Sequence, residues 1–182
     1  MDKISKPAGK AIVATFALLV LVTAGFLLVK ISEKKRVIDG RNVFTPLEIS
    51  LSGNKTYTIS GTPRENRFII MFFDADCYYC HVETEALVEN IELLEGIDIY
   101  MITTNDPETV LQFEEKHGLA NYPGIITGRV SEETIVNGYG IRGVPSMLIY
   151  DEKGCLVFSN FGYTPVEDIL AALELSQTAS NP

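Results

Sequence analysis

Apolar and polar residues follow several distinct patterns along this chain of 182 residues. Two short and almost continuous apolar runs, 67–73 and 97–103, are typical of strands that are buried on both faces of a sheet. Between them, apolar side chains recur at roughly helical spacing: Val82, Ala86, Ile91 and Leu94. The pattern therefore predicts a strand, a helix that ends at about Leu94 before Gly96, and a second strand.

Turn and capping residues divide the rest of the chain. Residues 47–59 alternate between apolar and polar around Ser52-Gly53-Asn54, which predicts a small hairpin. Asp106-Pro107 begins a second helix, and Gly118 ends it after His117. The remaining segments are predicted to be, in order, an extended piece at 122–126, one or two helical turns at 131–137 capped by Ser131, a strand at 144–150, a turn at 151–154, an antiparallel strand at 155–160 and an amphipathic helix from Thr164-Pro165 to about Ser176. This order predicts an α/β fold with a mixed sheet and helices on both of its faces.

One segment, residues 11–29, is long and apolar enough to cross a bilayer. It contains no charged residue, and lysines flank it on both sides. A cleaved signal peptide is the alternative, but the apolar run is longer than a usual signal core, and Val22-Thr23-Ala24 is a mediocre cleavage site. We therefore predict one transmembrane helix and four parts: a membrane anchor at 1–31, a charged linker at 32–42, a folded domain at 43–177 and a disordered tail at 178–182.

Charge is distributed unevenly between these parts. The formal net charge of the whole chain is −9, but residues 43–182 contain seven Lys/Arg and 21 Asp/Glu, a net charge of −14. Such a surface repels the phosphates of nucleic acids and of anionic lipids. We expect no nucleic-acid binding, and no membrane contact besides the anchor.

The candidate chemistry is concentrated at Cys77-Tyr78-Tyr79-Cys80, between the first buried strand and its helix. Two thiols three residues apart can close a small disulfide, and the N-terminus of a helix stabilises a thiolate. Asp74 and Asp76 oppose a thiolate at Cys77, whereas a protonated His81 favours it, so the balance of charge stays open. The segment indicates redox chemistry.

The side of the membrane on which this dithiol lies rests on two opposed indications. Three lysines precede residues 11–29 and five Lys/Arg follow them within 30–41, a count that mildly favours a cytoplasmic domain. A tethered dithiol, however, is of little use where soluble reductants are abundant. We therefore expect a single-pass membrane protein with its folded domain outside the cytoplasm.

A second motif follows about 65 residues after the first: Tyr139-Gly140-Ile141-Arg142-Gly143-Val144-Pro145-Ser146. In this order and spacing, the two motifs resemble those of the thioredoxin superfamily, and the second resembles its cis-proline loop. The hairpin at 47–59 and the strand and helix at 97–117 further resemble the membrane-anchored, extracytoplasmic branch of bacterial thiol-disulfide oxidoreductases, which includes proteins of cytochrome c maturation. The likeness extends over about residues 43–175. It implies a three-layer thioredoxin-like fold with a mixed central sheet and an added N-terminal hairpin.

The resemblance also implies a role for each matching residue. Cys77 is the attacking thiolate and Cys80 the resolving thiol, while the Val144 backbone beside the cis-proline Pro145 receives a substrate chain. The implied activity is thiol-disulfide exchange through a mixed disulfide, with the Cys77–Cys80 pair as redox centre and no bound cofactor or metal. The implied partners are protein thiols and disulfides, and an upstream membrane or soluble thiol reductant or oxidant. Tyr78 and Tyr79 are candidate partner contacts, although exposed tyrosines at a turn need no such role.

Three positions depart from the family pattern. Asp76 replaces an aromatic residue before the first cysteine, Tyr79 replaces a frequent proline before the second, and Met71 occupies the position of a buried acid in thioredoxin. These departures leave the direction of electron flow open.

The two cysteines are also compatible with several different kinds of site. They can form a structural disulfide or part of a zinc site, although one C-x-x-C without a second ligand pair is weak evidence for zinc. The segment 77–81 matches the C-x-x-C-H pattern of c-type haem attachment. A copper carrier has only His81 and His117 as histidine ligands, and His117 near a helix end is also accounted for by the helix dipole. A thioredoxin-like domain that binds a partner without turnover is a further alternative.

Three more polar or reactive side chains have a possible structural role beside a functional one. Cys155 is expected to be a half-buried small hydrophobe on the strand at 155–160 rather than a redox partner. Glu83 and Glu85 are expected on a solvated helix face, with a proton relay to Cys80 as the alternative.

Overall fold

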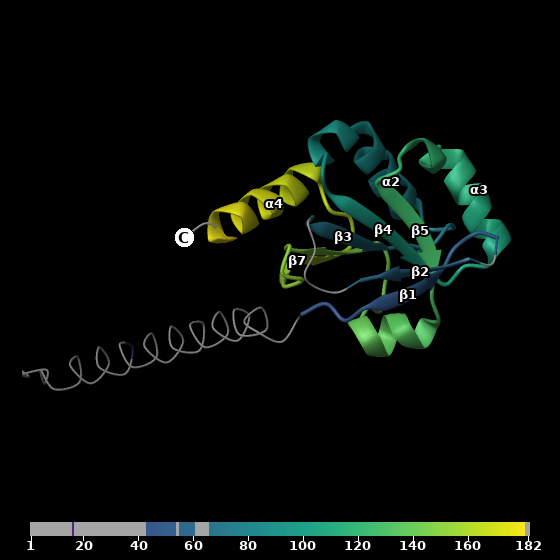
Figure 1. Cartoon of the computed structure of the whole chain (residues 1–182), viewed down its shortest axis with the longest axis horizontal. Coiled ribbons are helices and arrows are strands. Elements are labelled where there is room, and N and C mark those ends of the chain that lie inside the picture. Colours follow the sequence, from purple (N-terminus) through teal and green to yellow (C-terminus); the bar gives the residue numbers. More distant parts are fainter. Residues whose placement is uncertain (1–15, 17–42, 54, 61–65, 181–182) are drawn as a thin grey trace, which may run out of the picture. The chain divides into compact units, whose positions relative to one another are not determined.

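The computed structural model describes residues 16, 43–53, 55–60 and 66–180 (Figure 1). The predicted membrane segment at 11–29 lies outside these residues, apart from Phe16. Within the ranges that are described, no helix combines the length and the apolar character needed to span a bilayer.

A mixed sheet forms the centre of the folded domain. Among the described residues it has seven strands in the order β2-β1-β5-β4-β3-β6-β7. β3, β4 and β5 are parallel to one another, whereas the other neighbours are paired antiparallel. The strands are β1 (Leu47–Ser50), β2 (Thr56–Ile59), β3 (Phe68–Phe72), β4 (Asp98–Thr103), β5 (Ile125–Arg129), β6 (Ser146–Tyr150) and β7 (Leu156–Phe161). The predicted mixed sheet and the predicted N-terminal hairpin, β1–β2, are confirmed.

Helices cover both faces of this sheet (Figure 1). The three longer helices pack on one face: α2 (Tyr78–Glu89), α3 (Pro107–His117) and α4 (Val166–Ser180). The opposite face is covered by the helical turns η3 (Thr134–Gly138), through Ile135, and by Phe44 and Ile141. Short 3₁₀ turns, η1 (Ile91–Leu94) and η2 (Leu119–Asn121), follow α2 and α3. The three-layer thioredoxin-like arrangement is therefore present.

The central position of β3 explains its unbroken apolar sequence. Ile69 and Met71 belong to the core beneath α2 and α3, whereas Phe68, Ile70 and Phe72 belong to the core on the opposite face. All five side chains are fully buried. Because side chains alternate between the faces of a strand, a strand covered on both sides must be apolar at every position.

Local capping chemistry fixes the ends of α3 where the sequence predicts them. One carboxylate oxygen of Asp106 accepts hydrogen bonds from the N–H groups of Glu108 and Thr109, both at 3.0 Å. Gly118 ends the helix with φ 62°, a left-handed conformation that glycine adopts without a steric penalty.

Several boundaries differ from the predicted ones. α2 ends at Glu89, because the backbone N–H and the side-chain amide of Asn90 both donate to the Ala86 carbonyl, at 3.2 and 2.9 Å. The chain then continues as the 3₁₀ turn η1, so Leu94 still reaches the core. The extended piece predicted at 122–126 is a strand that begins later, at Ile125, and α4 continues beyond Ser176 to Ser180.

Candidate active site

Cys77 lies just beyond the carboxyl end of β3 and is the N-cap residue of α2. Its sulfur accepts a hydrogen bond from the backbone N–H of Cys80 at 3.3 Å. The side chain is partly exposed. A sulfur in this position faces the unpaired N–H groups and the positive end of the helix, which stabilise a thiolate.

Cys80 lies one turn into α2 and is fully buried. Both cysteines are free thiols in this structure. Burial raises the pKa of the Cys80 thiol, and the hydrogen bond with Cys77 and the charge of Glu83 raise it further. The two sulfurs thus differ in access: Cys77 can meet a partner, whereas Cys80 is shielded.

The Val144–Pro145 peptide bond is cis, as the sequence predicts, and it faces the dithiol. The sulfur of Cys77 donates to the carbonyl oxygen of Val144 at 3.8 Å. Pro145 is buried, while Val144 is 38% exposed. In the part of the chain that the structure describes, the N–H of Val144 donates to no acceptor. The two sequence motifs therefore meet at one site, with an unused backbone donor beside the exposed sulfur.

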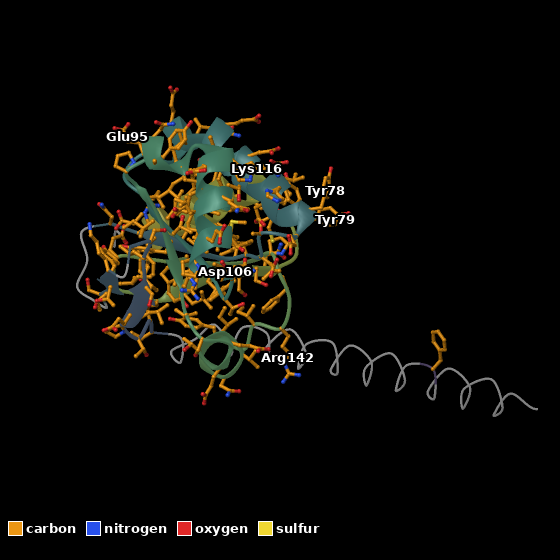
Figure 2. The ribbon with its side chains drawn as sticks, turned by 90° about the vertical axis from the view of Figure 1, so that its right-hand side faces the viewer. Tyr78, Tyr79, Glu95, Asp106, Lys116 and Arg142 are labelled. Carbon is orange, nitrogen blue, oxygen red and sulfur yellow. The ribbon has the colours of Figure 1, made fainter. Side chains whose placement is uncertain are left out.

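Tyr78 and Tyr79 stand at the surface immediately after Cys77. They are 72% and 60% exposed, and their rings meet edge to face at a centroid distance of 5.4 Å. Figure 2 shows both side chains projecting from the edge of the domain. Their predicted partner contact is therefore sterically available.

The loop that carries Cys77 is held by the side chain of Asn105, which follows β4. The side-chain carbonyl oxygen of Asn105 accepts from the Ala75 N–H at 2.9 Å and from the Thr103 hydroxyl at 2.8 Å. Its amide nitrogen donates to Asp74 at 3.2 Å, and the other Asp74 oxygen accepts from the Asp76 N–H at 2.8 Å. This network fixes the backbone that leads into the dithiol, and no sequence pattern indicated it.

His81 is held between the active-site loop and α3. Its Nε2 lies 2.9 Å from the Ala75 carbonyl oxygen, and its Nδ1 lies 2.6 Å from Nε2 of His117. The ring stacks on Phe113 at 5.0 Å, and the Lys116 ammonium lies 3.4 Å from Nδ1. Burial lowers the pKa of His117, and the neighbouring His81 lowers it further.

These contacts bear on the haem and copper alternatives. Either ring nitrogen of His81 must leave its present partner before it can bind a metal. In the described ranges, no three His, Cys, Asp or Glu residues are grouped so that they could hold a metal ion. His117 contacts His81 and does not act only as a charge at the end of α3.

Glu83 contradicts the solvated face predicted for it, whereas Glu85 is exposed as expected. Glu83 is 1% exposed, because the buried stripe of α2 contains Cys80, Glu83, Thr84 and Leu87 at helical spacing. One carboxylate oxygen accepts from the Thr164 N–H at 3.1 Å, and the other has no hydrogen-bond partner. Burial raises the pKa of Glu83 to about 7. The helical spacing from Cys80 could have indicated that Glu83 is buried, but its hydrogen-bond donor, Thr164, lies 81 residues away in the sequence.

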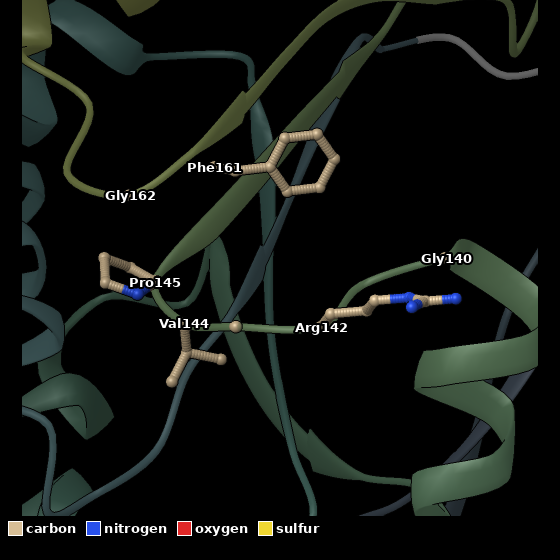
Figure 3. Close-up of a pocket in the computed structure, with 7 residues that line it drawn as sticks. Gly140, Arg142, Val144, Pro145, Phe161 and Gly162 are labelled. Atoms are coloured by element: carbon tan, nitrogen blue, oxygen red, sulfur yellow. The ribbon is translucent and has the colours of Figure 1, made fainter.

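A pocket of about 420 Å³ lies beside the cis peptide (Figure 3). Val144 and Pro145 form one side, and the ring of Phe161 lies across from them. Arg142 lines the pocket on the side of Gly140 and extends away from Pro145. Phe161 is 66% exposed, and sequence reasoning missed it because the strand predicted there ended at residue 160.

The connection between β7 and α4 joins the two halves of the site. The Gly162 N–H donates to the Pro145 carbonyl at 2.8 Å, and the Thr164 N–H donates to Glu83 on α2. The Asn160 side-chain amide stabilises this connection by donating to the carbonyls of Gly162 and Tyr163 and to the Thr164 hydroxyl. The cis-proline loop and the dithiol helix are thus tied to the same short segment.

Cys155 does not belong to this site. It precedes β7 at the turn after Tyr150, whereas Pro145 precedes the other end of β6. The side chain is exposed, so the expected half-buried position is wrong. Residue 155 precedes β7, where it forms an isolated antiparallel bridge with Val43 and its N–H donates to the Asp151 carboxylate at 2.7 Å.

The comparison with family models gives one match, a thioredoxin-like domain over residues 54–177. The chain belongs to this thioredoxin-like family. The enzyme class predicted from the sequence, a thioredoxin-like thiol-disulfide oxidoreductase, agrees with that membership. No curated protein matches the chain in sequence.

Solved structures show the same fold at low identity. StoA from Bacillus subtilis is 14% identical with a TM-score of 0.55, and the match covers 73% of this chain and 99% of that one. The thioredoxin domain of a thiol-disulfide oxidoreductase from Bacteroides vulgatus is 18% identical with a TM-score of 0.58, covering 73% and 94%. A secreted Mycobacterium tuberculosis disulfide oxidoreductase, homologous to E. coli DsbE, is 13% identical with a TM-score of 0.58, covering 71% and 95%.

Proposed function

We propose that this protein is a membrane-anchored thiol-disulfide oxidoreductase that exchanges disulfides with protein substrates outside the cytoplasm. The observation that carries the proposal is the position of the Cys77 sulfur, which is partly exposed between the N-terminus of α2 and the Val144 carbonyl. Cys80, shielded one turn away, is the resolving thiol. The Cys77–Cys80 pair is the redox centre, and the reaction needs no bound cofactor.

Exchange proceeds through a mixed disulfide. The Cys77 thiolate attacks one sulfur of a substrate disulfide, a bond forms between them, and the other substrate sulfur leaves as a thiolate. Cys80 then attacks the Cys77 sulfur, closes the Cys77–Cys80 disulfide and releases the second substrate thiolate. The substrate is reduced by two electrons and the dithiol is oxidised by two. The reverse sequence oxidises a substrate dithiol.

Glu83 supplies the base for the second step. The Cys80 thiol must lose its proton before it attacks, and burial holds its pKa well above the usual range. The Glu83 carboxyl lies on the same buried stripe, has a pKa of about 7 and keeps one oxygen without a hydrogen-bond partner. Met71, where thioredoxin has a buried acid, is a buried apolar residue on β3. Of the acidic side chains that the structure describes, Glu83 alone is buried.

The membrane location rests on the sequence. The uncharged segment at 11–29 is long enough to anchor the domain, and the net charge of −14 over 43–182 repels anionic headgroups. The solved relative from Mycobacterium tuberculosis is described as secreted, which is compatible with an extracytoplasmic domain here. An upstream thiol reductant or oxidant completes the cycle.

Thiol trapping of the full chain tests the proposal. With a protein disulfide as substrate, Cys80→Ala is expected to accumulate a mixed disulfide at Cys77, and Cys77→Ala is expected to lose exchange. If Cys77→Ala kept the wild-type exchange rate, the proposal would be wrong. Partner capture that survives loss of both cysteines would instead indicate a binding module, and a strong haem absorption band would indicate a haem carrier. The reduction potential of the Cys77–Cys80 pair distinguishes a protein that reduces substrate disulfides from one that oxidises substrate dithiols.

A further inference from the structure

The surface around Cys77 exposes five large apolar side chains from three separate segments. They are Tyr78 and Tyr79 at the start of α2, Val144 before β6, Phe161 at the end of β7 and Tyr163 after it, all 38% to 72% exposed. Isolated exposed apolar residues are ordinary, but a group of this kind around a reactive sulfur marks an interaction site.

Arg142 adds a cation to this surface. Residues 43–182 contain seven Lys/Arg against 21 Asp/Glu, so a cation at this place is unusual for the domain. Arg67 is paired with Glu152 at 3.4 Å, and the Arg129 guanidinium donates to the backbone carbonyl of Asn105. Arg142, by contrast, is exposed and has no hydrogen bond or ion pair within the described residues. Its guanidinium is available to a ligand.

The backbone between these side chains is prepared for an extended chain. The N–H of Val144 has no acceptor within the described residues, and its carbonyl meets only the Cys77 thiol. Suppose that a substrate segment pairs with Val144 as an added strand. Since Arg142 and Val144 are two residues apart, the substrate residue near Arg142 is then about two positions from the substrate residue opposite Val144, and both point to the same face because strand residues alternate between faces. The exposed Asp76, which precedes Cys77 in the chain, repels negative charge.

We propose that the substrate is an extended polypeptide segment whose cysteine is flanked by an apolar residue that enters the pocket beneath Phe161 and by a carboxylate that pairs with Arg142. This inference rests on the proposed function and specifies its substrate. The apolar residue is buried between Val144, Pro145 and the Phe161 ring, and the guanidinium selects the acidic side chain. The site thus chooses among polypeptides by the charge about two residues from the reacting cysteine.

Single-cysteine peptides activated as thiopyridyl disulfides test the inference. The full chain in an uncharged detergent carries Cys80→Ala, so the mixed disulfide accumulates, and Cys155→Ser, so the exposed third thiol does not react. The peptides have Leu next to the cysteine and Glu, Gln or Lys two residues away on both sides. Attack by Cys77 releases thiopyridone, whose absorbance gives the rate. We expect Glu to react fastest and Lys slowest, with about a tenfold range that shrinks at high salt.

Substitutions assign this preference to particular side chains. Arg142→Gln is expected to remove the difference between the peptides, and Arg142→Glu to reverse it. Lys153→Glu is the matched control. Lys153 is exposed in the turn at the other end of β6, and its replacement by Glu changes the net charge by the same amount as Arg142→Glu. Phe161→Ala is expected to slow the Leu-flanked peptides about fivefold and to leave Gly-flanked peptides unchanged.

Several results would overturn the inference. These are equal rates for the three peptides, a preference for Glu that persists in Arg142→Glu, an equal loss in Lys153→Glu, and no effect of Phe161→Ala. The small uncharged reagent 2,2′-dithiodipyridine separates this failure from failure of the proposed function. If Cys77 reacts with the reagent but not selectively with the peptides, only the substrate assignment is wrong; if it reacts with neither, the exchange activity itself is wrong.

Discussion

Nδ1 of His81 and Nε2 of His117 lie 2.6 Å apart, so one ring donates a hydrogen bond to the other. Because the Ala75 carbonyl accepts from Nε2 of His81, the neutral pair is satisfied when His81 Nδ1 accepts and His117 Nε2 donates. The tautomers are inferred from these partners. The pair fastens the loop before Cys77 to the end of α3.

This pair predicts a loss of stability in mild acid. Burial and His81 lower the pKa of His117 below 6.5, Lys116 lowers it further, and Glu85 opposes them. The folded state therefore binds fewer protons than the unfolded state. The contribution of His117 to stability is complete above pH 6.5 and is lost as the pH falls through the pKa of His117 in the folded state. Urea unfolding of wild type and His117→Gln is expected to converge as the pH falls from about 7 to about 5. Parallel curves would contradict this.

Glu83→Gln is expected to change both stability and the second chemical step. Since burial raises the pKa of Glu83 from 4.5 to about 7, the stability that it contributes is complete below pH 4.5 and is lost as the pH rises through about 7. At about pH 8 the glutamine variant should be more stable by about 3–3.5 kcal/mol, because the shift from 4.5 to about 7 corresponds to about 1.4 kcal/mol for each pKa unit.

The same variant should release substrate from the mixed disulfide at least about tenfold more slowly, because Cys80 lacks its base. Single-turnover release, measured against pH, is expected to rise with a midpoint near 7 in the wild type and to lose this step in Glu83→Gln. Glu83→Asp, which keeps a carboxylate, should recover part of the rate. Equal rates in all three proteins would remove Glu83 from the mechanism.

Asn105→Ala is expected to destabilise the domain by about 1–3 kcal/mol, because the Ala75 N–H loses its acceptor and the Asp74 carboxylate loses a donor. The loop before Cys77 loosens as a result, so the rate of mixed-disulfide formation should fall. Asn105→Asp keeps the acceptor but places a second carboxylate against Asp74. Its stability is therefore expected to recover at low pH, unlike that of Asn105→Ala. Thermal unfolding at two pH values distinguishes the variants.

Gly128→Ala tests the docking of the N-terminal hairpin on the sheet. A Cβ at residue 128 on β5 would lie 2.8 Å from Cβ and Cγ1 of Ile49 on β1 and closer still to its Cδ1. We expect a loss of about 1–3 kcal/mol in the free energy of unfolding from this overpacking. Gly138→Ala is the control, since a Cβ there meets nothing within 4 Å. Equal unfolding midpoints for the two variants would show that β1 yields freely.

Sequence reasoning predicts the features whose causes lie close together in the chain. Asp106 and Gly118 mark the ends of α3 because an Asx cap and a left-handed glycine act within a single turn. The unbroken apolar run of β3 indicates burial on both faces without any knowledge of the partners. The two cysteines and the cis-proline were recognisable because each motif is contiguous.

Features that depend on distant segments escaped prediction. Glu83 lies on the buried stripe of α2 and accepts from the Thr164 N–H, and the sequence near Glu83 does not indicate that contact. Phe161 lines the pocket only because β7 pairs with β6 next to Pro145. The end of α2 at Glu89 escaped for a local reason, since the Asn90 side chain competes for the Ala86 carbonyl while the apolar periodicity continues.

The short segment from Asn160 to Thr164 holds Pro145 with one backbone group and Glu83 with another. Its redesign therefore cannot be modular. If the surface around Phe161 is transferred to another scaffold, the segment 160–164 and Glu83 on α2 must be transferred with it. Without Glu83 the new protein is expected to recognise its substrate but to lack the proton acceptor needed to release it.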